Sequence, residues 1–152
     1  MTAPYPMLWF ASEAEEAVEL YTSLIPGSEV LRVQRFPEGT PGATPGEPMT
    51  ITFTLGGTTY AALNGGPHEA FNDSISLVLE CAGQDELDRM WQGLLDGGGE
   101  PSQCGWLRDR YGVRWQVVPD NLYELLSKPA AVIAMLSMVK LDIAGLEAAG
   151  RS

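Results

Sequence analysis

Hydrophobic and polar positions in the first half of the chain recur with the periods of strands and of one helix. From Met49 to Leu55 every second residue is apolar, which predicts a strand with one buried face. Gly56-Gly57 then predicts a tight turn into the next strand. The predicted elements are a strand, a helix and three strands, at residues 8–10, 13–25, 29–36, 49–55 and 58–63.

The second half repeats this order of elements, with little residue identity. Apolar residues at helical spacing predict a helix that ends at Gly97-Gly98-Gly99. The predicted elements are a strand, a helix, a short strand and two longer strands, at residues 74–79, 84–96, 100–102, 104–109 and 113–118. An order that occurs twice predicts two similar modules.

Two signals predict where helices begin. Ser12 and Glu15 form a capping box before the first helix, and Asp142 is placed to cap the last one. Past Pro119 the chain is predicted to be helical, with segments near 120–127, 130–139 and 143–149. Apolar residues in this tail predict that it covers a surface, either the protein's own core or a second subunit.

The predicted strands carry different residues on their two faces. The face that suits packing under helices is apolar and holds Ile51, Phe53, Ile75, Leu77, Val113, Trp115 and Val117. The opposite face is small and polar and holds Thr50, Thr52, Thr54, Asn64, Ser74, Ser76, Arg114 and Gln116. An antiparallel sheet with one face in water gives such a pattern, but a solvated face usually has more Lys and Glu. We therefore predict that the polar face lines a cavity.

Composition narrows the classes of function. The net charge of −11 argues against nucleic-acid binding, because phosphate contacts need clustered Lys and Arg. No charged-then-apolar leader and no apolar run of membrane-spanning length occur, so we expect a cytoplasmic protein that binds no membrane. Cys81 and Cys104 have no metal-site or redox spacing and are expected to be reduced thiols.

His68 is the single histidine among 152 residues. Many hydrolytic and oxygenase metal sites use at least two imidazoles, so one subunit of this chain cannot build such a site. His68 follows a predicted strand in a Gly-Gly-Pro-His loop, where it is either a solvated hydrogen-bonding residue or a base or ligand contact at the mouth of a cleft.

Several blocks of the sequence resemble one family. They are Pro6-Met7-Leu8-Trp9-Phe10, Ala14-Glu15-Glu16-Ala17 with Tyr21, Leu63-Asn64-Gly65-Gly66-Pro67-His68, Cys104-Gly105-Trp106-Leu107-Arg108-Asp109-Arg110-Tyr111-Gly112, and Trp115-Gln116-Val117-Val118-Pro119. This pattern is similar to the PhnB-like family, often labelled 3-demethylubiquinone-9 3-methyltransferase. The two strand–helix–strand–strand–strand modules resemble the vicinal oxygen chelate superfamily, of which that family is one branch and which includes glyoxalase I, extradiol dioxygenases and bleomycin-resistance proteins.

The resemblance covers nearly the whole chain and implies an α+β fold. It implies two βαβββ modules that form a curved mixed sheet cleft, at about residues 5–64 and 74–119. The two modules make a single domain, 1–119, and residues 120–152 form a C-terminal helical extension. Members of the superfamily pair their modules within or between subunits, so we expect a homodimer.

Metal-using members of the superfamily place ligands on four strands. The resemblance puts these positions at or near Pro6, Asn64, Ser74 and Gln116. None of the four offers an imidazole or a carboxylate, and neutral amide oxygens hold Zn, Ni or Fe weakly. We therefore expect no bound metal and no cofactor, as in bleomycin-resistance proteins, which act by binding alone.

Methyl transfer is not expected either. Transfer from S-adenosylmethionine usually relies on a glycine-rich loop between a strand and a helix of a doubly wound parallel sheet. The Gly-Gly pairs of this chain lie at predicted hairpins, and its Gly-Gly-Gly run lies at a helix end.

The sequence thus predicts a protein that binds a small organic molecule in the sheet cleft. The predicted ligand-binding residues are Thr52, Asn64, His68, Ser74, Ser76, Trp106, Arg114 and Gln116. The alternative is a glyoxalase- or dioxygenase-type enzyme with an atypical or metal-free site, the latter using His68. A third interpretation is a dimeric interaction module that uses the helical tail. No catalytic residue is assigned.

Overall fold

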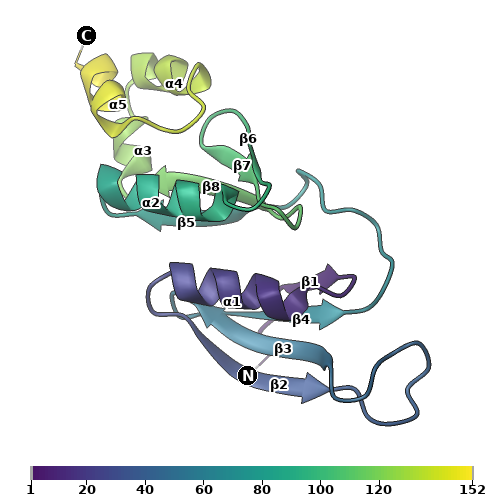
Figure 1. The fold of residues 1–152 in the computed structure, drawn as a ribbon. Helices are drawn as coiled ribbons and strands as arrows, with labels where there is room; N and C mark the ends of the chain where they lie inside the picture. Colours follow the sequence, from purple (N-terminus) through teal and green to yellow (C-terminus); the bar gives the residue numbers. More distant parts are fainter. Residues whose placement is uncertain (1, 152) are drawn as a thin grey trace. The chain divides into compact units, whose positions relative to one another are not determined.

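The computed structural model describes residues 2–151 and forms two compact units, one up to Glu69 and one from Ala70 onward. Each unit has the order strand, helix, strand, strand, strand and holds an open four-stranded mixed sheet (Figure 1). This confirms the predicted α+β fold with two βαβββ modules. The helical tail belongs to the second unit, and its separation from a domain of residues 1–119 stays a prediction.

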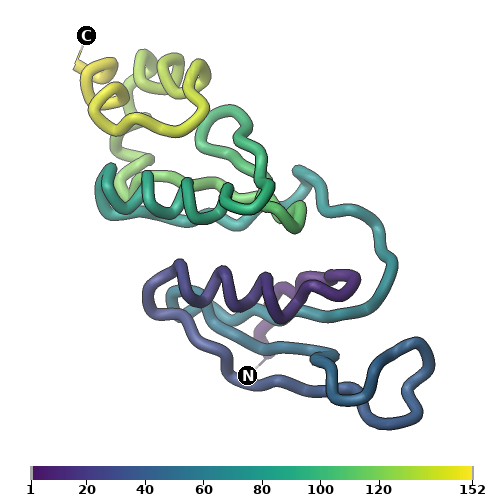
Figure 2. Tube along the Cα trace, viewed as in Figure 1, coloured from purple at the N-terminus to yellow at the C-terminus, as the bar shows by residue number. Residues whose placement is uncertain are grey.

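The first unit consists of one helix and four strands. They are β1 (Met7–Phe10), α1 (Ala14–Leu24), β2 (Glu29–Arg35), β3 (Pro48–Leu55) and β4 (Thr58–Asn64). The strand order is β1-β4-β3-β2, with β1 parallel to β4 and the other pairs antiparallel. Gly56 and Gly57 both have positive φ, which the tight turn between β3 and β4 requires. The trace in Figure 2 shows a long loop, residues 36–47, between β2 and β3.

The core of the first unit lies between α1 and one face of its sheet. Ala17 and Tyr21 of the helix are fully buried, as are Ile51 and Phe53 of β3. The alternation from Met49 to Leu55 therefore predicted the buried face correctly, because side chains of a strand point to opposite faces in turn.

The capping box predicted for the first helix is wrong. The helix begins at Ala14 with Glu13 in the N-cap position, and no side chain caps it from there. Instead the Oδ1 atom of Asn64, at the end of β4, accepts a hydrogen bond from the Ala14 N–H at 2.9 Å. A strand residue thus satisfies one of the free N–H groups that every helix start presents.

The same hydrogen bond shows that Asn64 does not lie on the polar face of the sheet, where the sequence pattern predicts it. It follows Ala62 by two residues, and Ala62 pairs with Ile51 on the face that packs against α1. Asn64 therefore points to the helix side of the sheet, opposite to Thr52.

The second unit has the same plan followed by three short helices. Its elements are β5 (Leu77–Cys81), α2 (Gln84–Leu95), β6 (Glu100–Pro101), β7 (Trp106–Arg108), β8 (Arg114–Pro119), α3 (Leu122–Leu125), α4 (Pro129–Leu136) and α5 (Ile143–Gly150). The strand order is β5-β8-β7-β6, with β5 parallel to β8. Leu87, Met90, Trp91 and Leu94 of α2 are buried, as expected from their helical spacing.

Two strands of this unit are shorter than predicted. Ile75 was assigned to the buried face of a strand from residue 74, yet it is 61% exposed and precedes β5. The Asn72 side chain accepts a hydrogen bond from the Ser74 N–H at 2.8 Å. Because this bond forms a local turn, the strand begins only at Leu77. Cys104 was predicted to begin another strand, but its φ of 60° is incompatible with extended backbone.

The helical tail is attached to α2 and covers the second unit itself. The Gln84 side chain donates from Nε2 to the Leu141 carbonyl at 3.1 Å and accepts at Oε1 from the Ile143 N–H at 2.8 Å. Leu141 and Leu146 are fully buried. Asp142 occupies the N-cap position of α5 as predicted, but its side chain makes no capping hydrogen bond.

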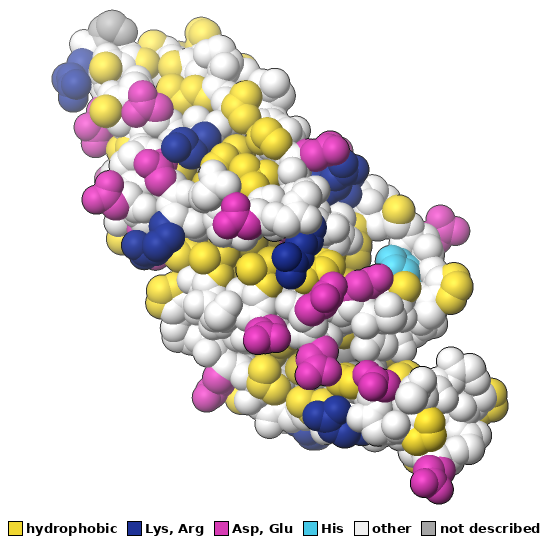
Figure 3. Space-filling model, viewed as in Figure 1, with side chains coloured by type: hydrophobic (Ala, Val, Ile, Leu, Met, Phe, Trp, Pro, Cys, Tyr) yellow, Lys and Arg dark blue, Asp and Glu magenta, His cyan; other side chains and the backbone are white. Residues whose placement is uncertain are grey.

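On the face that Figure 3 shows, acidic and basic side chains are interspersed, with apolar groups visible between them.

Within residues 2–151 no helix has both the length and the apolar character needed to cross a membrane.

Candidate functional site

The sheet of the second unit has one face that α2 does not cover, and polar side chains line it. In the antiparallel pair β7–β8, Trp106 lies opposite Gln116 and Arg108 lies opposite Arg114. Directly opposed residues share a face, so these four side chains stand together. Leu107 and Trp115, which alternate with them, are buried on the helix side.

A buried carboxylate shapes the hairpin that presents both arginines. Asp109 accepts hydrogen bonds at Oδ1 from the Tyr111 and Val113 N–H groups, at 2.9 and 3.0 Å. Its Oδ2 accepts from Nε1 of Trp115 at 2.9 Å. Asp109 is 2% exposed, and this network fixes the turn between Arg108 and Arg114.

The guanidinium of Arg114 donates three hydrogen bonds within the second unit. Its Nε donates to Asp73 at 2.9 Å, and its Nη1 donates to the carbonyl oxygens of Phe71 and Gly112 at 3.1 and 2.7 Å. These bonds fix the guanidinium in one orientation at the edge of the sheet. Asp73 is thus the ion-pair partner of Arg114.

The neighbouring side chains are also paired. Arg108 forms an ion pair with Glu100 of β6 at 2.5 Å. Gln116 donates from Nε2 to the Ser76 hydroxyl at 2.9 Å. Three residues of the face, Arg108, Arg114 and Gln116, are thus oriented by specific contacts.

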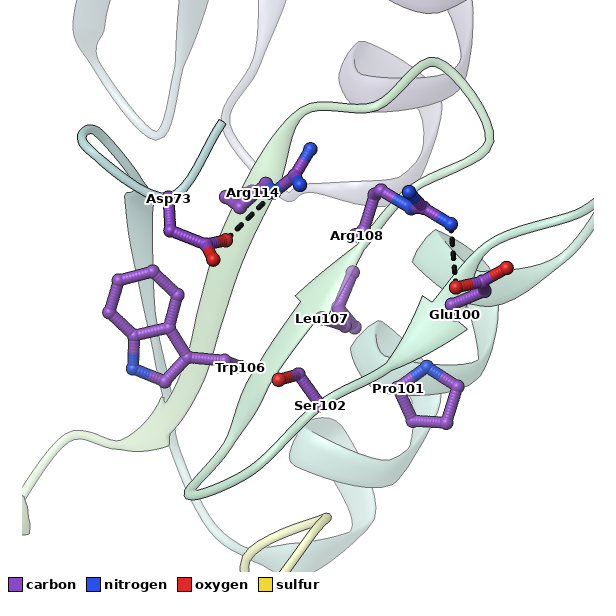
Figure 4. A pocket seen from close by; sticks show the side chains of 8 residues that line it. All are labelled: Asp73, Glu100, Pro101, Ser102, Trp106, Leu107, Arg108 and Arg114. Atoms are coloured by element: carbon purple, nitrogen blue, oxygen red, sulfur yellow. Dashed lines mark hydrogen bonds and ion pairs between the residues drawn. The ribbon is translucent and has the colours of Figure 1, made fainter. Parts of the chain in front are cut away.

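Arg108 and Arg114, with the acids that pair with them, border an open pocket of about 180 Å³ (Figure 4). Figure 4 shows Arg114 paired with Asp73 on one side and Arg108 paired with Glu100 on the other. The pocket is lined by Asp73, Glu100, Pro101, Ser102, Trp106, Leu107, Arg108 and Arg114.

The structure brings four of the predicted ligand-binding residues to this face: Ser76, Trp106, Arg114 and Gln116. Ser74 lies in the exposed turn before β5. Arg108 was missed, although the hairpin is symmetric about Tyr111 and that symmetry pairs it with Arg114. Glu100 and Asp73 lie on other segments, so only the folded sheet shows their pairing.

The other three predicted residues belong to the first unit. Thr52 is half-buried on the sheet face away from α1, where it lies opposite Ala61. Asn64 uses its amide within the protein, since Nδ2 donates to the Pro48 carbonyl at 3.0 Å in addition to the bond at Oδ1. Contact of Thr52 or Asn64 with a ligand stays a prediction.

His68 is exposed at the end of the first unit's loop after β4. Its Nδ1 is hydrogen-bonded to the Glu69 carbonyl at 2.6 Å, and because a carbonyl can only accept, Nδ1 carries the proton. The His68 ring lies 6.2 Å from the Trp9 ring, and Trp9 donates from Nε1 to the Gly66 carbonyl at 3.1 Å. The imidazole is therefore placed against an aromatic side chain.

Metal ligands do not gather in the described part of the chain. Among residues 2–151 no group of three His, Cys, Asp or Glu side chains is placed to hold a metal ion. Of the four positions that the resemblance assigned to ligands, Asn64 and Gln116 use their amides in hydrogen bonds within the protein.

A larger hollow of about 360 Å³ lies in the first unit between α1 and β2. Val18, Val30 and Ile51 form its apolar wall, and Glu15, Glu19 and Arg35 are also among its lining residues. The volume and the apolar wall of this hollow are closer to those of a typical ligand pocket, but the smaller pocket has several polar groups fixed in orientation, which is what specific recognition needs.

A family model described as 3-demethylubiquinone-9 3-methyltransferase matches residues 3–118. The chain belongs to this family. The family match includes β1 to β8 up to Val118 and ends before the helical tail.

A solved structure agrees with this membership. The PhnB protein from Bacillus cereus, described under the same methyltransferase name, is 30% identical with a TM-score of 0.70, and the match covers 77% of this chain and 99% of that one. Protein PA1353 from Pseudomonas aeruginosa shows the same fold; it is 21% identical with a TM-score of 0.63, and the match covers 78% of this chain and 97% of that one. A comparison with curated proteins gives no match.

More distant structures show the fold alone. The fosfomycin resistance protein FosX from Mesorhizobium loti is 11% identical with a TM-score of 0.56, and the match covers 84% of this chain and 98% of that one. The fold of this family member is therefore the one shared by glyoxalase and bleomycin-resistance proteins.

Proposed function

We propose that the protein binds a small organic molecule on the uncovered face of the second unit's sheet. The observation that carries the proposal is the pair of oriented arginines, Arg108 and Arg114, that lines the pocket beside Trp106. Two backbone carbonyl oxygens fix the guanidinium of Arg114 before any ligand is present. Such preorganisation favours binding, because the side chain then loses less conformational entropy when a ligand binds.

The proposal includes membership of the vicinal oxygen chelate superfamily as a binding protein without its metal. It rests on the glyoxalase-like fold and on the amides that stand at Asn64 and Gln116. The cytoplasmic location and the homodimer expected from the sequence remain part of it.

The strand order and strand directions of the two sheets favour binding over methyl transfer. Each sheet is mixed and has one parallel pair, β1–β4 or β5–β8. The doubly wound parallel sheet with a glycine-rich phosphate-binding turn, which usually holds S-adenosylmethionine, has a different topology.

The test is a thermal-shift screen of small aromatic and aliphatic compounds, followed by calorimetry of each compound that raises the melting temperature. Trp106→Ala is expected to weaken these compounds about tenfold, because the indole gives apolar contact area beside the pocket. Tyr123→Ala is the matched control, since Tyr123 is an exposed aromatic residue of α3 that does not line the pocket. Equal affinities for wild type and Trp106→Ala would overturn the proposal.

A further inference from the structure

Four charged side chains form a row across the uncovered face of the second sheet. The order is Asp73, Arg114, Arg108 and Glu100, with the two arginines directly opposite each other and an acid at each end. Like charges directly opposite in a sheet are destabilising, since their Cβ atoms are about 4.5–5.5 Å apart. The sheet therefore keeps two cations side by side in the middle of the row.

The two acids are far more exposed than the arginines they pair with. Asp73 is 81% exposed against 18% for Arg114, and Glu100 is 68% exposed against 43% for Arg108. Exposed ion pairs contribute little stability, so Glu100 can be replaced by a competing anion at small cost. Asp73 is itself largely exposed, although its partner Arg114 is not, so its carboxylate can also move into water. Arg114 would keep its place when Asp73 leaves, because the carbonyl oxygens of Phe71 and Gly112 still hold Nη1.

We infer that the ligand of this pocket is a small organic anion whose acidic group binds between Arg108 and Arg114 in place of Asp73 and Glu100. The inference rests on the proposed function and adds the chemical class of the ligand. A carboxylate, a phosphonate or a phosphate monoester has the oxygens that paired guanidinium groups recognise. An apolar part attached to the acidic group would lie against Trp106, which lines the same pocket.

The size of the pocket limits the ligand. Its open volume of about 180 Å³ is smaller than the roughly 300–1,000 Å³ typical of sites for drug-sized molecules. A molecule with one ring or a short chain fits this description. The net charge of −11 repels anions from the protein as a whole, so binding of an anion reports local recognition by the two arginines.

The experiment compares phenylphosphonate with benzyl alcohol by calorimetry on the full chain. The two compounds share a ring, and the first carries the anionic group. Arg108→Gln is expected to weaken phenylphosphonate about tenfold, because hydrogen bonds to charged groups are the strong ones. Arg89→Gln, on the exposed surface of α2, makes the same change in net charge and is expected to have little effect.

The variant Asp73→Asn gives a result of the opposite sign. Removing the competing carboxylate is expected to strengthen phenylphosphonate about threefold, the size of an exposed ion pair. Asp85→Asn, an exposed acid of α2, controls for the change in net charge. A row of purely structural ion pairs would give no gain in Asp73→Asn.

The outcomes separate the inference from the proposed function. If benzyl alcohol binds as tightly as phenylphosphonate and Trp106→Ala weakens both, the pocket binds ligands and the anionic class is wrong. Equal losses in Arg108→Gln and Arg89→Gln would also overturn the inference. So would the absence of phenylphosphonate binding, at millimolar concentration, to both wild type and Asp73→Asn.

Discussion

The Oδ1 atom of Asn64 accepts a hydrogen bond from the backbone N–H of Ala14 at 2.9 Å, so the end of β4 caps the start of α1. Asn64→Ala is expected to lower the free energy of unfolding by about 0.5–2 kcal/mol, the usual cost of losing a helix cap. Ser12→Ala is expected to change it by less than about 0.5 kcal/mol, because the Ser12 side chain does not cap the helix. Urea denaturation measures both, and a larger loss for Ser12→Ala would contradict the assignment.

Gly65 leaves room for the Trp9 indole. A Cβ atom at Gly65 would lie 2.5 Å from Cε2 of Trp9, closer than any real contact. Gly65→Ala is therefore expected to displace the indole, break its bond to the Gly66 carbonyl and cost about 1–3 kcal/mol of stability.

The control for this prediction is a double-mutant cycle with Trp9→Ala. If the indole is the obstacle, Gly65→Ala costs much less when Trp9 is already truncated. The same cost in both backgrounds would place the cause in the backbone instead.

The two thiols are expected to differ in reactivity. Burial, with smaller contributions from Glu86 and Asp120, raises the pKa of the Cys81 thiol to about 12. At pH 8 only about one Cys81 in 10,000 is then a thiolate, the reactive form. A chromogenic disulfide reagent should label one thiol per folded chain quickly, at Cys104, and the second only on unfolding.

The raised pKa also gives a sign for stability at alkaline pH. The unfolded thiol ionises near its ordinary pKa of 9.0, whereas the folded one stays protonated until about 12. The contribution of Cys81 to stability is therefore full below pH 9 and falls as the pH rises toward 12. Cys81→Ala should flatten this part of the pH profile, and an unchanged profile would contradict the assignment.

Adding a chelator is expected to leave the melting temperature of the protein unchanged, because we expect no bound metal. Neither Asn64 nor Gln116 supplies a charged ligand, so protein purified without chelator should hold well under one Zn, Ni, Mn or Fe per chain by plasma mass spectrometry. Its melting temperature should not fall when a chelator is added. A stoichiometric metal whose removal lowers that temperature would restore the metal-dependent enzyme as the better interpretation.

The sequence predicted the elements of each module because local patterns determine them. Alternation from Met49 to Leu55 and the glycine turn after it need no knowledge of distant residues. The role of Asn64 was not predictable in this way. It depends on the position of β4 against the start of α1, which brings together residues fifty positions apart.

The candidate site was predictable in part for the same reason. Arg108 and Arg114 lie on one hairpin, so their pairing follows from its symmetry about Tyr111. The acids that complete the row come from β6 and from the loop before β5, and the exposure of Ile75 depends on a turn formed by Asn72. Such contacts arise from the assembled sheet rather than from a local period.

The most direct test of the proposed function is to map the amide signals that move when a compound from the thermal-shift screen is added to isotope-labelled protein. The proposal predicts that the largest shifts fall on β7 and β8, with the indole N–H of Trp106 among them. Shifts confined to the residues of the hollow between α1 and β2 would contradict the proposal and would place the binding site in the first unit.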